Sequence, residues 1–190
     1  MIGALVAGIT GSGGASLSSY ESIATISGTG SSGTITFSSI PSTFKHLQIR
    51  YIARSSFAST GANPIFIRFN SDTGTNYAHH YLRTFEPGGV SASGTASTTR
   101  VQLTDVIPEA NDTNIVGAGI IDILDYGSTT KNKTVRGFAG FAGGASYSTS
   151  LVGSGVWLST SAVTSISLVL NSQNWLSASS FALYGIKESA

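Results

Sequence analysis

The stretch Phe44-Lys45-His46-Leu47-Gln48-Ile49-Arg50-Tyr51-Ile52-Ala53-Arg54 decides the fold class of this chain. Every second residue from Leu47 through Ile49 to Tyr51 is apolar, and most residues between them are polar or charged. A period of two is typical of a β-strand with one buried face, whereas an amphipathic helix repeats every 3.6 residues. We therefore expect a long strand over residues 44–54.

The same alternation returns along the rest of the chain, interrupted by Gly, Ser, Asn and Pro. No sustained helical stripe is present. Short alternating segments separated by turn residues are typical of an all-β fold, and we expect an antiparallel two-sheet β-sandwich, jelly-roll-like, with about ten strands. The other expected strands cover residues 20–27, 34–38, 65–70, 77–85, 100–106, 115–126, 133–141, 151–158, 163–170 and 181–187.

Two segments that connect the expected strands lead to specific structural predictions. The turn residues 28–33 separate two alternating segments, which predicts a hairpin between residues 20–27 and 34–38. Residues 87–98 are rich in Gly, Ser and Thr, so we expect a loop there.

The chain divides into a Gly/Ser-rich N-terminal arm, residues 1–19, and one sandwich domain, residues 20–190. The apolar residues of the arm are predicted to contact neighbouring subunits; they are Ile2, Leu5, Val6 and Ile9. This apolar run is too short to span a bilayer, and the first basic residue is Lys45, so it makes a poor signal peptide. We expect a protein made in the cytoplasm and not exported by the Sec route.

Charge is scarce in this sequence. Charged residues make up 10% of the 190 residues, the net charge is +1 and the mean hydropathy is +0.19, against roughly 25% charged residues in ordinary soluble domains. Little charge keeps copies apart, so we expect a homo-oligomer, with a trimer favoured. The scattered basic residues predict no nucleic-acid or membrane partner. The absence of cysteine excludes disulfides, thiol catalysis and Cys-ligated zinc.

Two loop motifs suggest ligands and are better explained as turns. Residues 28–33, Gly-Thr-Gly-Ser-Ser-Gly, match G-x-G-x-x-G, but a strand follows, whereas a dinucleotide site needs a helix. Oxygen-bearing side chains around Asp72, from Asn70 to Asn76, could bind calcium, although the spacing is not that of an EF-hand. An Asx-type turn is the alternative, and we predict no bound cofactor.

No catalytic constellation emerges from the sequence. His79 and His80 are adjacent on a strand and therefore point to opposite faces, as do Asp122 and Asp125 three residues apart. A glycosidase pair needs two carboxylates on one face, and a serine hydrolase needs a G-x-S-x-G elbow that is absent. We expect that the protein is not an enzyme.

Aromatic residues offer a second class of function, the binding of a host glycan. Trp175 follows Asn174 in an apparent loop, and Tyr147 lies in another, so these three residues are candidates for ligand contact. The alternative is that the aromatic residues, among them Tyr77, Tyr126 and Trp157, belong to the core or to an interface.

Several segments resemble structural proteins of tailed bacteriophages, most of them uncharacterised. The resemblance spans residues 20–187 and is carried by Tyr20-Glu21-Ser22-Ile23, Ile40-Pro41-Ser42-Thr43-Phe44-Lys45-His46-Leu47-Gln48-Ile49-Arg50, Arg68-Phe69-Asn70-Ser71-Asp72-Thr73-Gly74-Thr75-Asn76-Tyr77, His80-Tyr81-Leu82, Asp122-Ile123-Leu124-Asp125-Tyr126, Ser159-Thr160-Ser161-Ala162-Val163-Thr164-Ser165-Ile166 and Ser180-Phe181-Ala182-Leu183-Tyr184-Gly185-Ile186-Lys187.

The resemblance implies a virion protein with a jelly-roll-like domain, and it carries over no catalytic residue. Two functions stay open on this basis. The first is a capsid decoration or cement protein that self-associates and contacts other virion proteins. The alternative is a tail, fibre or collar component whose loops bind a host glycan.

Overall fold

The computed structural model describes residues 19–58, 62–86, 88–108, 114–143 and 147–187. These residues form strands, turns and irregular segments and contain no helix that could span a membrane. There are twelve strands: β1 (Tyr20–Ser27), β2 (Thr34–Phe37), β3 (His46–Ser55), β4 (Asn63–Phe69), β5 (Tyr77–Phe85), β6 (Gly89–Thr98), β7 (Val101–Pro108), β8 (Gly117–Leu124), β9 (Lys133–Ala142), β10 (Ser148–Trp157), β11 (Ile166–Leu170) and β12 (Ser180–Ile186).

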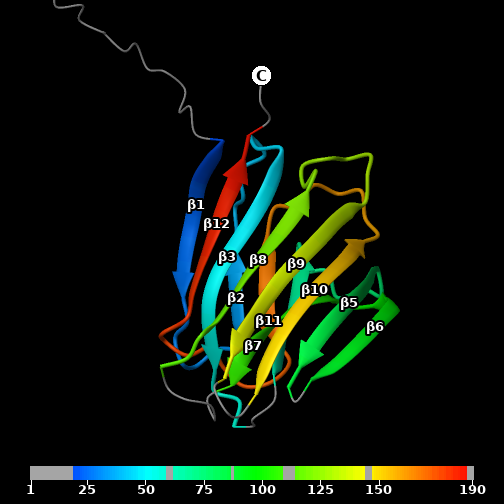
Figure 1. Cartoon of the computed structure of the whole chain (residues 1–190). Helices are drawn as coiled ribbons and strands as arrows, with labels where there is room; N and C mark the ends of the chain where they lie inside the picture. Colours follow the sequence, from blue (N-terminus) through cyan, green and yellow to red (C-terminus); the bar gives the residue numbers. More distant parts are fainter. Residues whose placement is uncertain (1–18, 59–61, 87, 109–113, 144–146, 188–190) are drawn as a thin grey trace, which may run out of the picture.

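The strands form the two layers of a β-sandwich, as expected (Figure 1). The larger layer, sheet A, has the order β1-β12-β3-β8-β9-β10-β5-β6. The smaller layer, sheet B, has the order β2-β11-β4-β7 and lies behind it in Figure 1. All pairs are antiparallel except a short parallel contact between β3 and β7 at Arg54 and Ser55, which joins the two layers.

The core lies between the layers and follows the alternation of the sequence. On β3, Leu47 and Ile49 are buried, whereas Arg50 and Ile52 point outward and are exposed. Strands β4 and β11 repeat the pattern from sheet B. Tyr77, Tyr126, Trp157 and Trp175 are all at most 3% exposed, which confirms that these aromatic residues belong to the core.

The predicted hairpin between residues 20–27 and 34–38 is wrong. Strand β1 pairs with β12 in sheet A, and β2 pairs with β11 in sheet B. Residues 28–33 therefore carry the chain from one layer to the other. Local turn residues predict a reversal, but they do not fix which strand becomes the partner, because that choice depends on distant segments.

The predicted loop over residues 87–98 is also wrong, because most of it is strand β6. Residues 89–95 pair with residues 79–85 of β5 in continuous register. Gly and Ser have low strand propensity, yet the backbone of any residue except proline can donate and accept in a sheet ladder. Strand β6 forms one edge of sheet A.

Candidate functional site

The outer face of sheet A carries a row of exposed apolar side chains across four neighbouring strands. Ile120 of β8 lies opposite Phe138 of β9, which lies opposite Val152 of β10, which lies opposite Leu82 of β5. Their exposed fractions are 40, 61, 52 and 48%, in that order. We call these four residues the apolar row.

The row of outward-facing residues next to it in register adds two more exposed apolar residues. Ile52 of β3 is 48% exposed and Val90 of β6 is 67% exposed. Between them lie Ala118, Gly140 and small polar residues in register. Single exposed apolar residues are normal on a protein surface, whereas the apolar row, extended at its two ends by Ile52 and Val90, is a patch of the kind that interaction sites show.

A chain of polar contacts runs along the other side of the apolar row. Arg50 Nε donates to Gln48 Oε1 at 2.7 Å, and Gln48 Nε2 donates to Asp122 Oδ1 at 2.8 Å. Arg136 Nε donates to Asp122 Oδ2 at 2.9 Å. The Arg50 guanidinium also lies over the rings of Tyr20 and Tyr184. These contacts fix the orientation of the side chains beside the apolar row.

A hollow of about 480 Å³ lies between the apolar row and this chain of polar contacts. Gln48, Asp122 and Arg136 line its polar side, and Ile120, Phe138 and Val152 line its apolar side. An aromatic residue beside an arginine is the composition that protein interfaces favour at their centre. The arrangement therefore fits a protein contact, with apolar burial for affinity and fixed polar groups for orientation.

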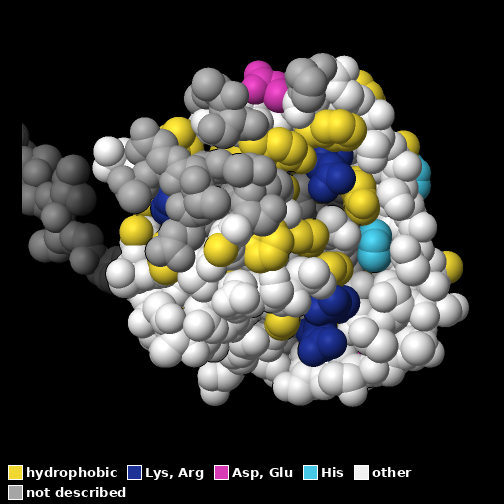
Figure 2. All heavy atoms as spheres, turned by 90° about the horizontal axis from the view of Figure 1, so that it is seen from below, with side chains coloured by type: hydrophobic (Ala, Val, Ile, Leu, Met, Phe, Trp, Pro, Cys, Tyr) yellow, Lys and Arg dark blue, Asp and Glu magenta, His cyan; other side chains and the backbone are white. Residues whose placement is uncertain are grey.

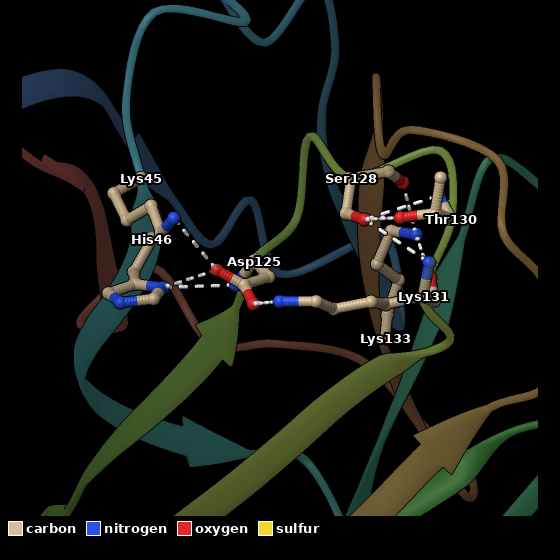
Figure 3. A network of polar contacts seen from close by, with 7 residues as sticks. All are labelled: Lys45, His46, Asp125, Ser128, Thr130, Lys131 and Lys133. Atoms are coloured by element: carbon tan, nitrogen blue, oxygen red, sulfur yellow. Dashed lines mark hydrogen bonds and ion pairs between the residues drawn. The ribbon is translucent and has the colours of Figure 1, made fainter.

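A second polar network lies just beyond the end of β8, in the turn to β9 (Figure 3). The Asp125 carboxylate lies 2.8 Å from Lys131 Nζ and 3.6 Å from Lys45 Nζ. The hydrogen bond from Lys131 holds the pKa of Asp125 below its ordinary value of 3.8. The Asp125 backbone N–H donates to His46 Nδ1 at 2.9 Å. The network joins the start of β3 to the end of β8.

Lys133, the first residue of β9, forms hydrogen bonds to the backbone of this turn. Its side chain is fully buried, and Nζ donates to the carbonyl oxygens of Ser128 and Lys131, both at 2.7 Å. Burial lowers the pKa of Lys133 from its ordinary value of 10.5. Two occupied donors inside the turn indicate a structural role, since the ammonium group already has backbone partners.

Hydrophobic and basic side chains also lie side by side at the lower end of the molecule (Figure 2). Val116, which precedes β8, is 38% exposed. The apolar row, by contrast, is in register across four strands. We therefore place the candidate surface on the outer face of sheet A.

The expectation that Trp175 contacts a ligand is wrong, because Trp175 is 0% exposed. Its ring packs edge-on against Phe181 with centroids 4.7 Å apart. The neighbouring Asn174 is partly buried, and its backbone N–H donates to Ser56 Oγ. Polar neighbours suggested an exposed loop, but the loop folds inward over the end of the core.

Tyr147 is the one predicted ligand-contact residue that keeps a partly accessible ring. It packs against Phe141 with centroids 6.0 Å apart. The predicted arm residues Ile2, Leu5, Val6 and Ile9 lie outside the described residues. Of the predicted site residues that the structure describes, Trp175, Asn174 and Tyr147, the first is buried, so these three do not form one exposed surface.

Asp72 forms the Asx-type turn. Its Oδ1 accepts from the Gly74 backbone N–H at 2.8 Å, and its Oδ2 accepts from Asn76 Nδ2 at 2.8 Å and from Trp157 Nε1 at 2.7 Å. These hydrogen bonds, that of Trp157 first, lower the pKa of Asp72. N–H donors that surround a carboxylate compete with a cation, so the geometry does not favour calcium.

The other candidate groups are separated as predicted. His80 lies on the outer face of β5 and His79 on the inner face, where burial lowers the pKa of His79. Asp122 and Asp125 belong to the two different polar networks described above. Among the described residues, no group of three or more His, Asp and Glu residues could hold a metal ion.

The sequence analysis did not find the apolar row, although a signal was present. Phe138 and Val152 occupy positions on β9 and β10 that alternate with the buried residues. An apolar residue at an expected polar position is the sign of a contact surface. The row became visible only with the strand register, because the four residues are far apart in the chain.

Comparisons with known proteins give no further guidance: no protein-family model, no curated protein and no solved structure matches this chain.

Proposed function

We propose that this chain is a non-enzymatic structural protein of a bacteriophage virion, a capsid decoration or cement protein. It assembles with copies of itself and with other virion proteins through the outer face of sheet A. The observation that carries the proposal is the apolar row, Ile120, Phe138, Val152 and Leu82, in register across four strands and 40–61% exposed. The phage context rests on the resemblance given by the sequence.

The chemistry of the face suits assembly. Burial of a fully exposed side chain of this size contributes about 1.5–3 kcal/mol, and the four half-exposed side chains of the row can each contribute about half of that. The chain Arg50–Gln48–Asp122–Arg136 lies beside them with its hydrogen bonds already formed. A prearranged polar border lowers the entropy cost of binding and selects the orientation of the partner.

The alternative, a glycan-binding tail, fibre or collar module, loses its main support. The glycan-binding hypothesis requires an exposed aromatic platform, but Trp175 is buried in the core. Tyr147 alone remains, and its ring packs on Phe141. The apolar row suits a protein partner better than a glycan, because its exposed side chains offer no hydrogen bonds to sugar hydroxyls.

The test is the copy number of the protein in purified particles of the virus that encodes it. The variant Phe138→Ser/Val152→Ser is expected to be depleted at least about tenfold. Full burial of such a side chain contributes about 1.5–3 kcal/mol, and about half of that is lost at each of these half-exposed positions, while 1.4 kcal/mol corresponds to a factor of ten. Leu158→Ser is the matched control, because Leu158 is 54% exposed but lies beyond the end of β10. Wild-type copy number for the double variant, with a normal melting temperature, would overturn the proposal.

A further inference from the structure

The described strands leave four sheet edges: β1 and β6 in sheet A, and β2 and β7 in sheet B, where β7 pairs with β3 only at its last two residues. An edge strand presents backbone N–H and C=O groups that can pair with another strand. Proteins usually protect such edges with charged residues, prolines, bulges or short strands. The four edges can therefore be compared by the protection that each carries.

Three of the edges carry such protection. Strand β1 has an irregularity in register between Ser22 and Ala24, and its Glu21 forms an ion pair with Lys187 at 2.8 Å. Strand β2 is only four residues long. Strand β7 contains Asp105 and Pro108, and its pairing with β4 has an irregularity in register. None of these three edges offers a long, regular and uncharged template.

Strand β6 carries none of these features over most of its length. Its ten residues, Gly-Val-Ser-Ala-Ser-Gly-Thr-Ala-Ser-Thr, include no charged residue and no proline. Residues 89–95 pair with β5 in continuous register, and the register shifts only beyond Thr95. Val90 of β6 and Leu82 of β5 are 67 and 48% exposed beside this edge. The edge is open and is bordered by uncovered apolar side chains.

We propose that residues 2–9 of a second copy add to β6 as an extra strand of sheet A. This inference rests on the proposed function, since it requires that copies of the chain assemble. The donor, Ile-Gly-Ala-Leu-Val-Ala-Gly-Ile, is eight residues long, uncharged and without proline, which matches the seven regular residues of β6. Strand addition satisfies the open backbone groups and continues the apolar surface beyond Leu82 and Val90.

The length of the chain before β1 favours a second copy as the donor. The ten residue steps from Ile9 to Ser19 span at most about 36 Å when fully extended. A strand added to β6 would lie eight strand spacings from β1, about 38 Å at the usual spacing. An arm would need more than its full extension to reach its own β6, whereas a neighbouring copy can approach freely. Such a head-to-tail contact forms a ring, for example a trimer, if the rotation closes.

Cysteine cross-linking tests the proposal, because the full chain contains no cysteine. Donor variants Ala4→Cys, Val6→Cys and Gly8→Cys are each mixed with the acceptor variant Ser93→Cys on β6 and oxidised. The matched control acceptor is Thr25→Cys, an exposed position on the β1 edge. At least one donor is expected to give about tenfold more mixed dimer with Ser93→Cys than with Thr25→Cys, because disulfides need Cβ atoms about 4 Å apart. Equal yields with all three donors would overturn the inference.

Amide hydrogen exchange gives an independent measurement on the full chain. The variant Leu5→Asp/Val6→Asp is expected to exchange the amides of residues 89–95 about tenfold faster than the wild type under assembling conditions. Unchanged exchange would contradict strand addition. If the β6 tests fail while Phe138→Ser/Val152→Ser still abolishes incorporation, the inference falls and the proposed function stands. If the β6 tests succeed while that variant incorporates normally, strand addition stands, and the outer face of sheet A is not the contact surface that the proposed function requires.

Discussion

Gly28 gives a packing reason for the G-x-G-x-x-G match at residues 28–33. A Cβ atom at position 28 would lie 2.1 Å from the Leu176 carbonyl oxygen, and one at Gly33 would lie 2.4 Å from the Gln173 carbonyl oxygen. Gly30 has a φ of 79°. The glycines therefore allow the turn to pack on the backbone of the loop that contains Trp175.

Gly28→Ala is expected to destabilise the protein by about 1–3 kcal/mol, because a backbone carbonyl cannot move aside as a side-chain tip can. Gly127→Ala is the control, since nothing lies within 4 Å of a Cβ atom there. Urea unfolding at pH 7 measures both. Equal stability of the two variants would show that the turn does not pack as described.

Asp72 predicts a dependence of stability on pH. Its pKa in the folded protein lies below the ordinary value of 3.8, mainly because Trp157 Nε1 donates to it. The stabilisation is therefore complete above about pH 4 and is lost as the pH falls through the folded-state pKa. Asp72→Asn is expected to cost about 1–3 kcal/mol at pH 7, and to lose less stability than the wild type between pH 4 and pH 2. Parallel pH profiles from urea unfolding would contradict this assignment.

The same hydrogen bonds predict that calcium does not stabilise the protein. Three N–H donors already surround the Asp72 carboxylate. The melting temperature is expected to be the same in chelator and in millimolar calcium. A rise in calcium would show that the carboxylate can exchange its N–H partners for a cation.

At the scale of the element, the turn between β8 and β9 depends on the buried Lys133. Lys133→Met is expected to cost about 1–3 kcal/mol, because the Ser128 and Lys131 carbonyl oxygens lose their donor. Lys131→Met, at a side chain that is 65% exposed, should cost clearly less than Lys133→Met. Thermal unfolding compares the two variants. A larger loss for Lys131→Met would contradict the structural role of Lys133.

The sequence predicts individual strands well where one face is buried. Strand β3 was recognisable from the alternation of Leu47, Ile49 and Tyr51, because burial imposes a period of two. Strand β6 was missed, because its residues 89–98 are nearly all small or polar and mostly exposed, so that no alternation of burial selects them. Its pairing with β5 depends on backbone hydrogen bonds, which the amino-acid composition does not reveal.

At the scale of the whole molecule, the two-layer architecture was predictable, but the strand partners were not. The pairing of β1 with β12 joins segments from opposite ends of the described chain. The burial of Trp175 also depends on a distant residue, Phe181 on β12, and local polarity gives no sign of it. The apolar row needs the register of four strands, so it follows from the fold and from no single segment.

The central claim is that the outer face of sheet A is a contact surface, and the mass of the protein in solution tests it most directly. Sedimentation equilibrium over a range of concentrations is expected to show that the wild type self-associates and that Leu158→Ser behaves like it. The variant Phe138→Ser/Val152→Ser should remain monomeric at least to about tenfold higher concentration, because each tenfold change corresponds to 1.4 kcal/mol. A wild-type chain that is monomeric throughout, or a double variant that associates as strongly as the wild type, would contradict the account.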